Sequence, residues 1–526
     1  MALLRDKLKK MDEDKRNILI ISFFYFATHF FLLIASGKWW DDWINYKQSV
    51  SELFAEAMEL GRPTSFIPCF ISMSLPECGY RILTFVFFYI ISVLFYRILE
   101  KVFEISKEKC LLITLLLNAI PINDARIMNA VFPYSFGLLF FVIAFYQLID
   151  ILKEEKPFSL KVILNLFLFI VAFSLNSALV FYAAALLLIL AKKKEKAVCY
   201  FEYLLLPIGY YLVKKIFFSQ PAGYEDYNTV TLEGLIYGVK NMFFAINTYL
   251  AAIIRRFTEC GSYFVIVFIF LMVLLCVVKK AEAEKKNDIK TDLLILICGL
   301  LVLAMALYPY IVVRMDYSVV LTGTKGRDYI LAGFGTSMII YSMIDIIVRE
   351  DLQKLIVAML CILGIFHFNM MYLEYQEDHY RQLSFQKQLI EHSELKGLNN
   401  IVYVSDSENE DLGITRFFTL NGNAAEAYGN ENRLIINGLD GTWILRNKDN
   451  LQAYKQRTYK MSGYNVDHGT IDAVVEYSCD ISKVNVLKLK LYELFNRDKF
   501  NDTIMNYSSM NVFLGDIEDY EMAKKQ

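Results

Sequence analysis

The chain has 526 residues, of which 56% are hydrophobic and 15% aromatic, and its mean hydropathy is +0.37. This composition excludes an ordinary soluble globular protein and is typical of a membrane protein. The net charge of −2 leaves no polybasic signature, so nucleic acid is excluded as a partner. Nine cysteines are scattered without a CxxC pair, which argues against a metal–thiolate site.

A basic segment, 1–16, begins the chain, and the apolar segment 17–36 follows it. A bilayer core of about 30 Å needs roughly 20 apolar residues per helix, so 17–36 is expected to be the first span. Ten further apolar segments raise the prediction to about 11 transmembrane helices, at 80–98, 110–122, 132–152, 160–175, 178–191, 199–218, 260–278, 292–313, 328–348 and 355–373.

The distribution of Lys and Arg predicts the orientation. Segments expected on the cytoplasmic side carry 24 basic residues, against 13 in the longer segments expected outside. The positive-inside rule therefore puts the amino end, 1–16, in the cytoplasm and, after an odd number of spans, the carboxyl end outside. The polar FSLNSA at 173–178 is expected to separate two spans of a tight hairpin. The apolar segment 241–254 is expected to be an interfacial helix.

Two segments of the chain are expected to lie outside the bilayer. Residues 37–79 are predicted to form short helices on the outer face, within a transmembrane domain of 17–373. From 374 the sequence turns polar, and the strand-like pieces NIVYVSD, NRLIING and GTIDAVVEYS predict a soluble domain over 374–526. The predicted fold is thus a polytopic α-helical membrane protein with a C-terminal extracytoplasmic α/β domain.

Acidic residues mark the first two outer loops. The motif WWDDW brings Asp41 and Asp42 just after the first span, and INDAR brings Asp124 and Arg126 into the next outer loop. The three tryptophans around the first pair are typical of an aromatic belt at the membrane surface. A carboxylate can accept a proton from a hydroxyl group. The pattern therefore predicts chemistry at the outer face.

Cations accompany these acids. Arg126 follows Asp124, and the later loop RMDYSVVLTGTKGRD contributes Lys325 and Arg327. Guanidinium and ammonium groups can offset the charge of a departing phosphate, so the expected substrate is a lipid-linked phosphate. Each of these cations also fits a side chain that only snorkels to the interface.

This layout resembles the C-type glycosyltransferase superfamily (GT-C), membrane enzymes that use polyprenyl-phosphate sugar donors. Its members have a cytoplasmic amino end, an acidic motif just after the first span, and a second acid in the next outer loop. The matching residues here are Asp41 and Asp42 of WWDDW and Asp124 of INDAR. The likeness covers roughly residues 10 to 370, and the tail 374–526 matches no subfamily.

The resemblance implies an inverting transfer of a sugar from a polyprenyl-phosphate donor to an envelope glycan acceptor, in a plasma membrane that is bacterial by the same likeness. Asp42 is the favoured base and Asp41 the alternative, because adjacent side chains point in different directions. Asp124 is expected to bind sugar or acceptor, and Arg126, Lys325 and Arg327 the donor phosphate. No cofactor is required: some relatives bind a divalent cation, but too few carboxylates cluster here to require a metal.

Two other functions stay open. A glycolipid flippase or transporter would move its substrate without making a glycosidic bond, and would place ionisable residues deep within the spans. A membrane O-acyltransferase acting on surface polysaccharide would rely on His29 or His367, which lie in the first and last predicted spans. Hydrogen bonding between helices is the more ordinary role of such histidines.

Overall fold

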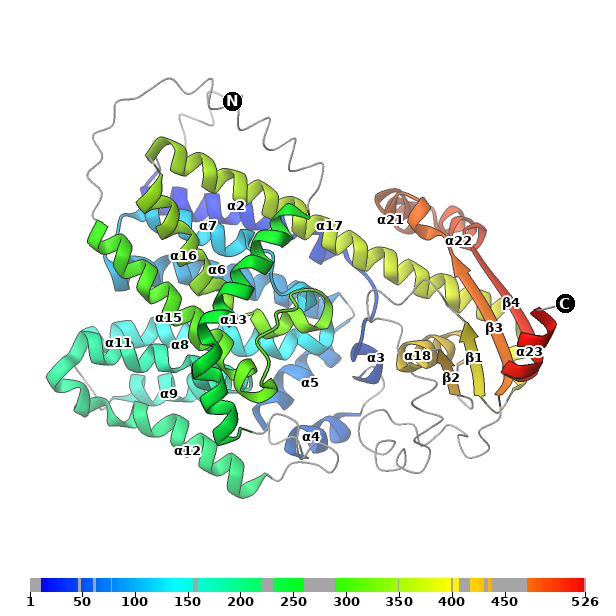
Figure 1. Cartoon of the computed structure of the whole chain (residues 1–526), viewed down its shortest axis with the longest axis horizontal. Coiled ribbons are helices and arrows are strands. Elements are labelled where there is room, and N and C mark those ends of the chain that lie inside the picture. The colour runs from blue at the N-terminus through cyan, green and yellow to red at the C-terminus, as the bar shows by residue number, and fades with distance from the viewer. Residues whose placement is uncertain are drawn as a thin grey trace. The chain divides into compact units, whose positions relative to one another are not determined.

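The computed structural model describes residues 11–45, 49–59, 63–76, 78–154, 159–218, 230–259, 289–348, 350–398, 401–405, 417–429, 434–437 and 471–524. The chain divides into two compact units, whose elements are drawn in Figure 1. Unit 1 comprises Met1–Ile34, Ser51–Ile127 and Val131–Met371, and unit 2 comprises Ala35–Val50, Met128–Ala130 and Tyr372–Gln526. Each unit has its own apolar core.

Unit 1 is helical throughout its described residues. Its α-helices are α2 (Glu13–Ile34), α4 (Val50–Glu59), α5 (Phe66–Ser74), α6 (Gly79–Phe103), α7 (Lys107–Ala119), α8 (Phe132–Glu154), α9 (Leu160–Ala172), α10 (Ala178–Phe181), α11 (Ala183–Lys193), α12 (Phe201–Phe217), α13 (Leu232–Thr258), α15 (Ile289–Arg314), α16 (Ala332–Ile347) and the first half of α17 (Glu350–Glu391). Short 3₁₀ turns connect some of them: η1 (Pro63–Ser65), η2 (Asp124–Ile127), η4 (Lys194–Tyr200) and η5 (Gly323–Tyr329). The turn η3 (Asn129–Val131) begins in the short segment Met128–Ala130, which belongs to unit 2.

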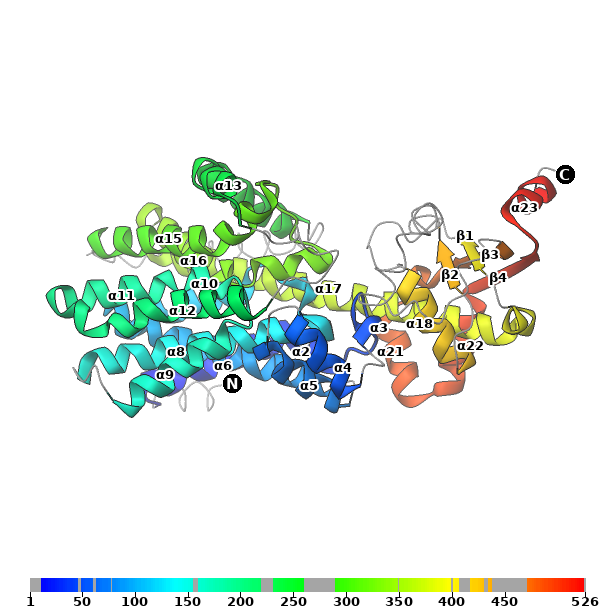
Figure 2. The same ribbon diagram turned by 90° about the horizontal axis from the view of Figure 1, so that it is seen from below.

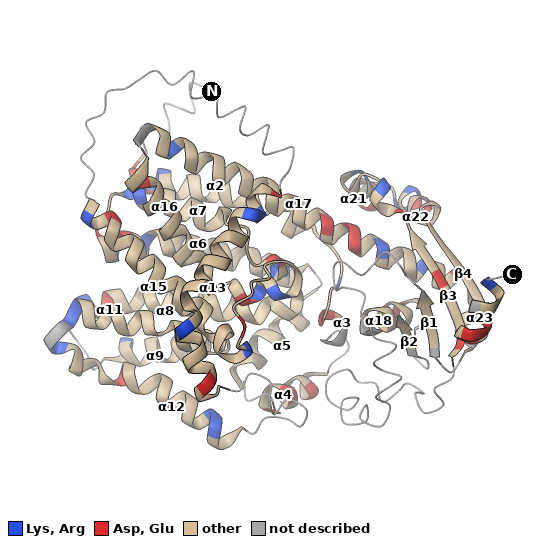
Figure 3. Ribbon diagram, in the orientation of Figure 1, with Lys and Arg blue, Asp and Glu red and all other residues tan. Residues whose placement is uncertain are grey.

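The helices of unit 1 are apolar on the outside as well as on the inside. Phe23, Ile163 and Phe217 are exposed, whereas Ile21 and Phe169 are buried in the core. In Figure 3 most of their length carries no charge. Helices that are hydrophobic all round are buried in lipid or in a large core, so this surface suits a bilayer.

Five helical segments among the described residues are long and apolar enough to cross a membrane: Glu13–Ile34, Gly79–Phe103, Asn129–Glu154, Ile289–Arg314 and Leu352–Glu391. A sixth is formed if Gly323–Tyr329 and Ala332–Ile347, bent by 71°, count as one span. The chain is therefore a helical membrane protein. The count of eleven stays a prediction, because α7 and α12 are shorter than the required length and 260–278 lies outside the described residues.

Several local predictions match the helices. The break expected at FSLNSA is present, because α9 ends at Ala172 and α10 begins at Ala178. The loop after the first span contains the short helices α4 and α5, as expected. The segment 241–254 is helical and forms part of α13, where it buries Ala245, Tyr249 and Ala252, and its place at the membrane surface stays a prediction.

Two helix crossings bring backbones into contact. A Cβ at Gly335 of α16 would lie 2.5 Å from the carbonyl oxygen of Gly299 in α15, and one at Gly364 of α17 would lie 2.5 Å from that of Ala119 in α7. Figure 2 shows α15 and α16 side by side. Small residues allow such close approach in membrane helices, so these glycines allow α15 to pack closely on α16, and α17 on α7.

Unit 2 is built around a mixed four-stranded sheet of order β2-β1-β3-β4. The strands are β1 (Ile401–Ser405), β2 (Leu434–Asn437), β3 (Ile471–Cys479) and β4 (Ser508–Leu514), with β1 parallel to both β2 and β3, and β3 antiparallel to β4. The helices are α3 (Asp42–Asn45), the second half of α17, α18 (Phe417–Tyr428), α21 (Val486–Phe495), α22 (Arg497–Asn506) and α23 (Ile517–Lys524), with 3₁₀ turns η6 (Ser393–Gly397) and η8 (Ile481–Lys483). The three strand-like pieces of the sequence are thus β1, β2 and β3.

Candidate active site

Asp124 lies in the turn η2, directly after α7 in unit 1. Asn123, Asp124 and Arg126 are each at most 6% exposed, so the turn carries its charges inside the protein. Asn123 has a φ of +59°, a left-handed conformation that Asn adopts more readily than most residues. Neither side-chain polar atom of Asn123 has a hydrogen-bond partner among the described residues. A buried amide without a partner is costly and marks a place where a ligand can bind.

Arg256, near the end of α13, pairs with Asp124. Its Nη2 donates to Asp124 Oδ2 at 2.5 Å and also lies 3.1 Å from His367 Nε2, on α17. A guanidinium group only donates, so His367 Nε2 is the acceptor and carries no proton in this arrangement. The second oxygen, Asp124 Oδ1, is buried, lies 3.8 Å from His367 Nε2 and accepts no hydrogen bond from any described residue.

Arg126 is fixed at the same turn by several contacts. Its guanidinium lies 4.7 Å from the ring centres of both Phe88 and Phe368, and its Nη2 donates to the carbonyl of Ile122 at 2.9 Å. Its Nη1 lies 3.5 Å from His29 Nε2, which must again be the acceptor. Aromatic faces stabilise a cation in surroundings that offer little water.

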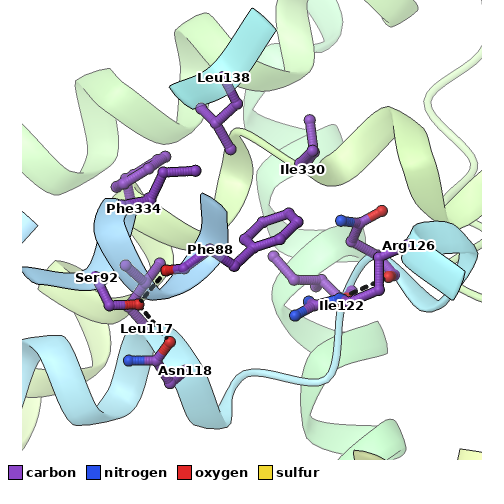
Figure 4. A pocket seen from close by; sticks show the side chains of 11 residues that line it. Phe88, Ser92, Leu117, Asn118, Ile122, Arg126, Leu138, Ile330 and Phe334 are labelled. Carbon is purple, nitrogen blue, oxygen red and sulfur yellow. Dashed lines mark hydrogen bonds between the residues drawn. The ribbon is translucent and has the colours of Figure 1, made fainter. Parts of the chain in front are cut away.

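A pocket opens beside this turn (Figure 4). Its lining is mostly apolar, with four polar side chains: it comprises Phe88, Ile91, Ser92, Leu117, Asn118, Ile122, Asn123, Arg126, Leu138, Ile330 and Phe334. Ser92 Oγ donates toward Asn118 Oδ1 at 2.7 Å. Asp124 is not part of the lining, although the residue before it and the second residue after it are. Its volume of about 30 Å³ has room for one or two water molecules, so the pocket places polar groups beside the turn without being large enough for a sugar.

The turn η5, in the loop between α15 and α16, lies against η2. A Cβ on Gly326 would lie 3.3 Å from the backbone nitrogen of Asp124, so glycine allows η5 to approach η2 closely. Within η5, Arg327 Nε is 3.9 Å from Asp328 Oδ1, and Asp328 also forms an ion pair with Arg314. The structure therefore brings η5, which carries Arg327, beside η2, and it leaves Lys325 exposed.

Asp316, in the same segment between α15 and α16, is already hydrogen-bonded. Its carboxylate accepts from the hydroxyl of Ser318 and, at 2.8 Å, from the Ser318 backbone N–H. These bonds hold the pKa of Asp316 below its usual value. Asp316 is exposed and is occupied within its own turn.

Asp42 belongs to unit 2, and both of its carboxylate oxygens are engaged. Oδ2 accepts from the backbone N–H of Trp39 at 3.1 Å, and Oδ1 accepts from that of Ala130 at 2.7 Å. Asp42 is 4% exposed and begins the short helix α3. The first hydrogen bond closes the WWDDW turn, and the second links this turn to the segment Met128–Ala130. Both bonds fit a carboxylate that stabilises the local structure.

Asp41 is half-buried and stands in the turn before α3. The residue before it, Trp40, has a φ of +52°, which is a true outlier for a bulky side chain. Asn123, before Asp124, shares this left-handed conformation. Strained backbone of this kind gathers at functional sites, and here the strain applies to Trp40, because Asn tolerates the left-handed conformation.

The expectation of an aromatic belt is wrong for two of the three tryptophans. Trp39 is fully buried and packs edge-to-face on Tyr375, and Trp43 is 8% exposed. A Cβ on Gly422 of α18 would lie 2.3 Å from the Trp43 ring. Trp43 Nε1 also donates to the carbonyl of Lys38 at 3.1 Å. These rings anchor the turn within unit 2 and do not face lipid.

Arg256 was not expected from the sequence as a residue of the site, and His367 was expected only for the alternative of acyl transfer. Arg256 lies on a helical stripe with Tyr249, Ala252 and Ile253, all of which are buried. Positions spaced three and four apart share one helix face, and this spacing was a usable signal that Arg256 points inward while Arg255 does not.

No group of three or more His, Cys, Asp or Glu side chains suitable for a metal ion occurs among the described residues. Searches of protein-family models, curated proteins and solved structures found no match to this chain.

Proposed function

We propose that this protein is an inverting glycosyltransferase of GT-C type that moves a sugar from a polyprenyl-phosphate donor to an envelope glycan. The observation that carries the proposal is the state of Asp124. One of its oxygens is held by Arg256, the other accepts no hydrogen bond from any described residue, and Asn123 and Arg126 of the same turn line an apolar pocket.

In the proposed reaction Asp124 is the base. Its Oδ1 accepts the proton of the acceptor hydroxyl, whose oxygen then forms a bond to the anomeric carbon. The bond from that carbon to the lipid phosphate breaks, and its electron pair leaves with the phosphate. The carboxylate charge would also favour a transition state of oxocarbenium character. Asp124 thereby takes the role that the sequence assigned first to Asp42.

The departing phosphate needs cations, and the site is rich in them. Arg126 lines the pocket, and the buried Nε of Arg256 has no hydrogen-bond partner among the described residues. We propose Arg327 of η5 and the exposed Lys325 as further ligands of the donor phosphate. Preorganised cations are effective where little water competes for the charge.

Asp41 remains a proposed acid of the same reaction, either as sugar ligand or as alternative base. Asp42 is proposed to hold the turn, since two backbone N–H groups occupy both of its oxygens. The half-buried position of Asp41 and the strained Trp40 before it support a role beyond anchoring.

The membrane arrangement that goes with this function is also a proposal. It has about 11 spans, a cytoplasmic amino end, the acidic turns outside and an extracytoplasmic carboxyl-terminal domain in a bacterial plasma membrane. The positive-inside distribution of Lys and Arg supports it.

Acyl transfer is less well supported. A histidine base needs a free imidazole lone pair, but His367 Nε2 accepts from Arg256, and His29 Nε2 faces Arg126 at 3.5 Å. A flippase is the remaining alternative, and it differs in making no glycosidic bond.

The test is a transfer assay on purified protein in nanodiscs, with a polyprenyl-phosphate sugar chosen from the glycan that disappears when the protein is removed from cells. Asp124→Asn should lower the rate by roughly 10²- to 10⁴-fold, the usual contribution of a general base. Asp316→Asn is the matched control, because that acid is bonded within its own turn. Full activity of Asp124→Asn would exclude the proposed base, and donor movement without any new glycosidic bond would favour the flippase.

A further inference from the structure

Helix α21 of unit 2 exposes an apolar face. Leu487, Leu491 and Leu494 are 43%, 56% and 57% exposed, and Phe495, at the end of the helix, is 82% exposed. Residues three and four positions apart share one face of a helix, so these side chains form a single stripe along α21. We call these four residues the α21 stripe.

The opposite face of α21 packs on the rest of unit 2. Leu489 is fully buried in its core, and Lys490 is 8% exposed. Lys490 Nζ lies 2.8 Å from Glu493 Oε2, which also accepts the hydroxyl of Tyr380 in α17 at 2.8 Å. These contacts fix the helix, and the stripe is left on its outer side. A helix that is apolar on both faces is expected to have an apolar partner on both.

The buried face of α21 is also bonded to the residue at which the chain leaves its first candidate span. Lys490 Nζ donates to Ser36 Oγ at 3.0 Å, and Ser36 Oγ donates to Glu493 Oε1 at 3.3 Å. Ser36 follows the end of α2, Glu13–Ile34, by two residues, and α2 is long and apolar enough to cross a membrane. Two residues span at most about 7 Å, so a bilayer surface is within reach of α21.

Basic side chains border the stripe. Lys488 of α21 and Arg497 and Lys499 of α22 are exposed, and Figure 3 shows basic residues on both helices. The ammonium groups of Lys488 and Lys499 lie 5.7 and 4.7 Å from the ring centre of Tyr492. From Val486 to Lys499 the chain has four basic and two acidic residues. An apolar face of Leu and Phe bordered by Lys and Arg is typical of a helix that lies in a membrane surface, whereas Lys is depleted from protein interfaces.

We propose that the α21 stripe inserts into the surface of a bilayer that contains anionic lipid, with Lys488, Arg497 and Lys499 at the lipid phosphates. A helix of this kind lies about 5–10 Å deep, at the boundary between headgroups and acyl chains. Unit 2 then has a third attachment to the membrane, besides the two helices α2 and α17 that lead into it. The proposal does not depend on the proposed transfer reaction.

Photocross-linking of the full-length protein in phosphatidylglycerol liposomes tests the insertion. The photoreactive residue p-benzoylphenylalanine replaces Leu491, Phe495 or, as the control, Met522 of α23. Met522 is 57% exposed, and α23 lies at the opposite end of β4 from α22 (Figure 1). All three side chains are exposed, so the replacements should leave the fold intact.

Mass spectrometry should find adducts with lipid acyl chains at positions 491 and 495 and none at position 522. Adducts at 491 and 495 with the same chain or with a second copy would overturn the proposal, because a protein surface would then cover the stripe. The absence of any adduct at these two positions would overturn it too, as would equal lipid adducts at all three.

The cations supply the second readout. Lys488→Gln combined with Arg497→Gln should lower the yield of the lipid adduct at position 491, by up to roughly fivefold for each cation. Phosphatidylcholine liposomes should lower the wild-type yield in the same way. Lys524→Gln is the control, since Lys524 is exposed and pairs with Glu476 at 3.1 Å. Equal wild-type yields in the two lipids, or an unchanged yield in the double variant, would overturn the assignment of an anionic surface.

Discussion

At the scale of single residues, the candidate site depends on which oxygen atoms are already occupied. Asp42 and Asp124 are both buried acids in turns after helices α2 and α7, yet they differ in their hydrogen-bond partners. Asp42 has a backbone N–H on each oxygen, whereas Asp124 keeps one oxygen that accepts no bond from the described residues. The sequence identifies both acids but cannot distinguish an anchor from a base, because the difference lies in backbone groups that only the fold brings near.

Removing the charge of Arg256 should disturb Asp124 without deleting it. Arg256→Met is expected to lower sugar transfer by about 10- to 1000-fold, because a buried carboxylate without its cation takes up a proton or changes position. Arg255→Met is the matched control, since Arg255 is exposed and one position away. The measurement is the rate of sugar transfer by both variants at equal protein level. Equal rates would show that the ion pair between Arg256 and Asp124 does not matter for the reaction.

Asp42 should affect stability more than chemistry. Asp42→Ala removes the acceptor of the buried N–H of Trp39 and of the half-buried N–H of Ala130, and a buried donor left unfilled costs about 1–3 kcal/mol. Ala130→Pro removes one of those N–H groups and should reproduce part of the loss, whereas Ala130→Ser should not. Thermal unfolding of the three variants tests this. An Asp42→Ala protein that is as stable as wild type but inactive would instead make Asp42 the base.

At the scale of elements, the sequence is most informative where a helix is long and apolar. The spans that became α2, α6, α8 and α15 were expected within a few residues of their ends. The polar second half of α17 and the three strands of unit 2 also match their patterns. Arg256 was missed because its partner is 132 residues away in the sequence, and no local pattern records such a distance.

The crossing of α15 and α16 should not tolerate a side chain at Gly335. Gly335→Leu would place atoms against the backbone of Gly299 and Leu303, and forced separation of packed helices typically costs about 1–3 kcal/mol. Because α16 follows η5, transfer activity should fall as well. Gly209→Leu in α12 is the control, since a Cβ there meets nothing within 4 Å. The unfolding temperature in nanodiscs should fall for Gly335→Leu and stay near the wild-type value for Gly209→Leu. An equal unfolding temperature for the two variants would contradict the prediction.

At the scale of the whole molecule, the sidedness of the chain can be tested with two exposed cysteines. Cys78 lies in the segment 37–79 expected outside, and Cys199 follows the basic KKKEK segment expected in the cytoplasm. In single-cysteine variants, a membrane-impermeant maleimide applied to intact cells should label Cys78 and leave Cys199 unlabelled. Permeabilised cells provide the control, in which both should react. Labelling of Cys199 alone in intact cells would invert the proposed orientation.

The division of the chain into units could not have been foreseen from composition. Hydropathy separates 17–373 from the polar tail, but the structure assigns Ala35–Val50 and Met128–Ala130 to unit 2 with that tail. The reason is specific contact: Trp39 packs on Tyr375, and Trp43 lies against Gly422. Aromatic residues just after a span fit a membrane surface and a protein interior equally well by sequence.

This division has a consequence for biosynthesis. Unit 2 joins a segment that leaves the ribosome among the first fifty residues to strands that leave it last, β3 and β4. Contacts that close such long loops form slowly. Trp39 and Trp43 therefore cannot pack on Tyr375 and Gly422 until nearly the whole membrane domain has been synthesised and inserted. We expect a membrane chaperone to protect this turn during that interval.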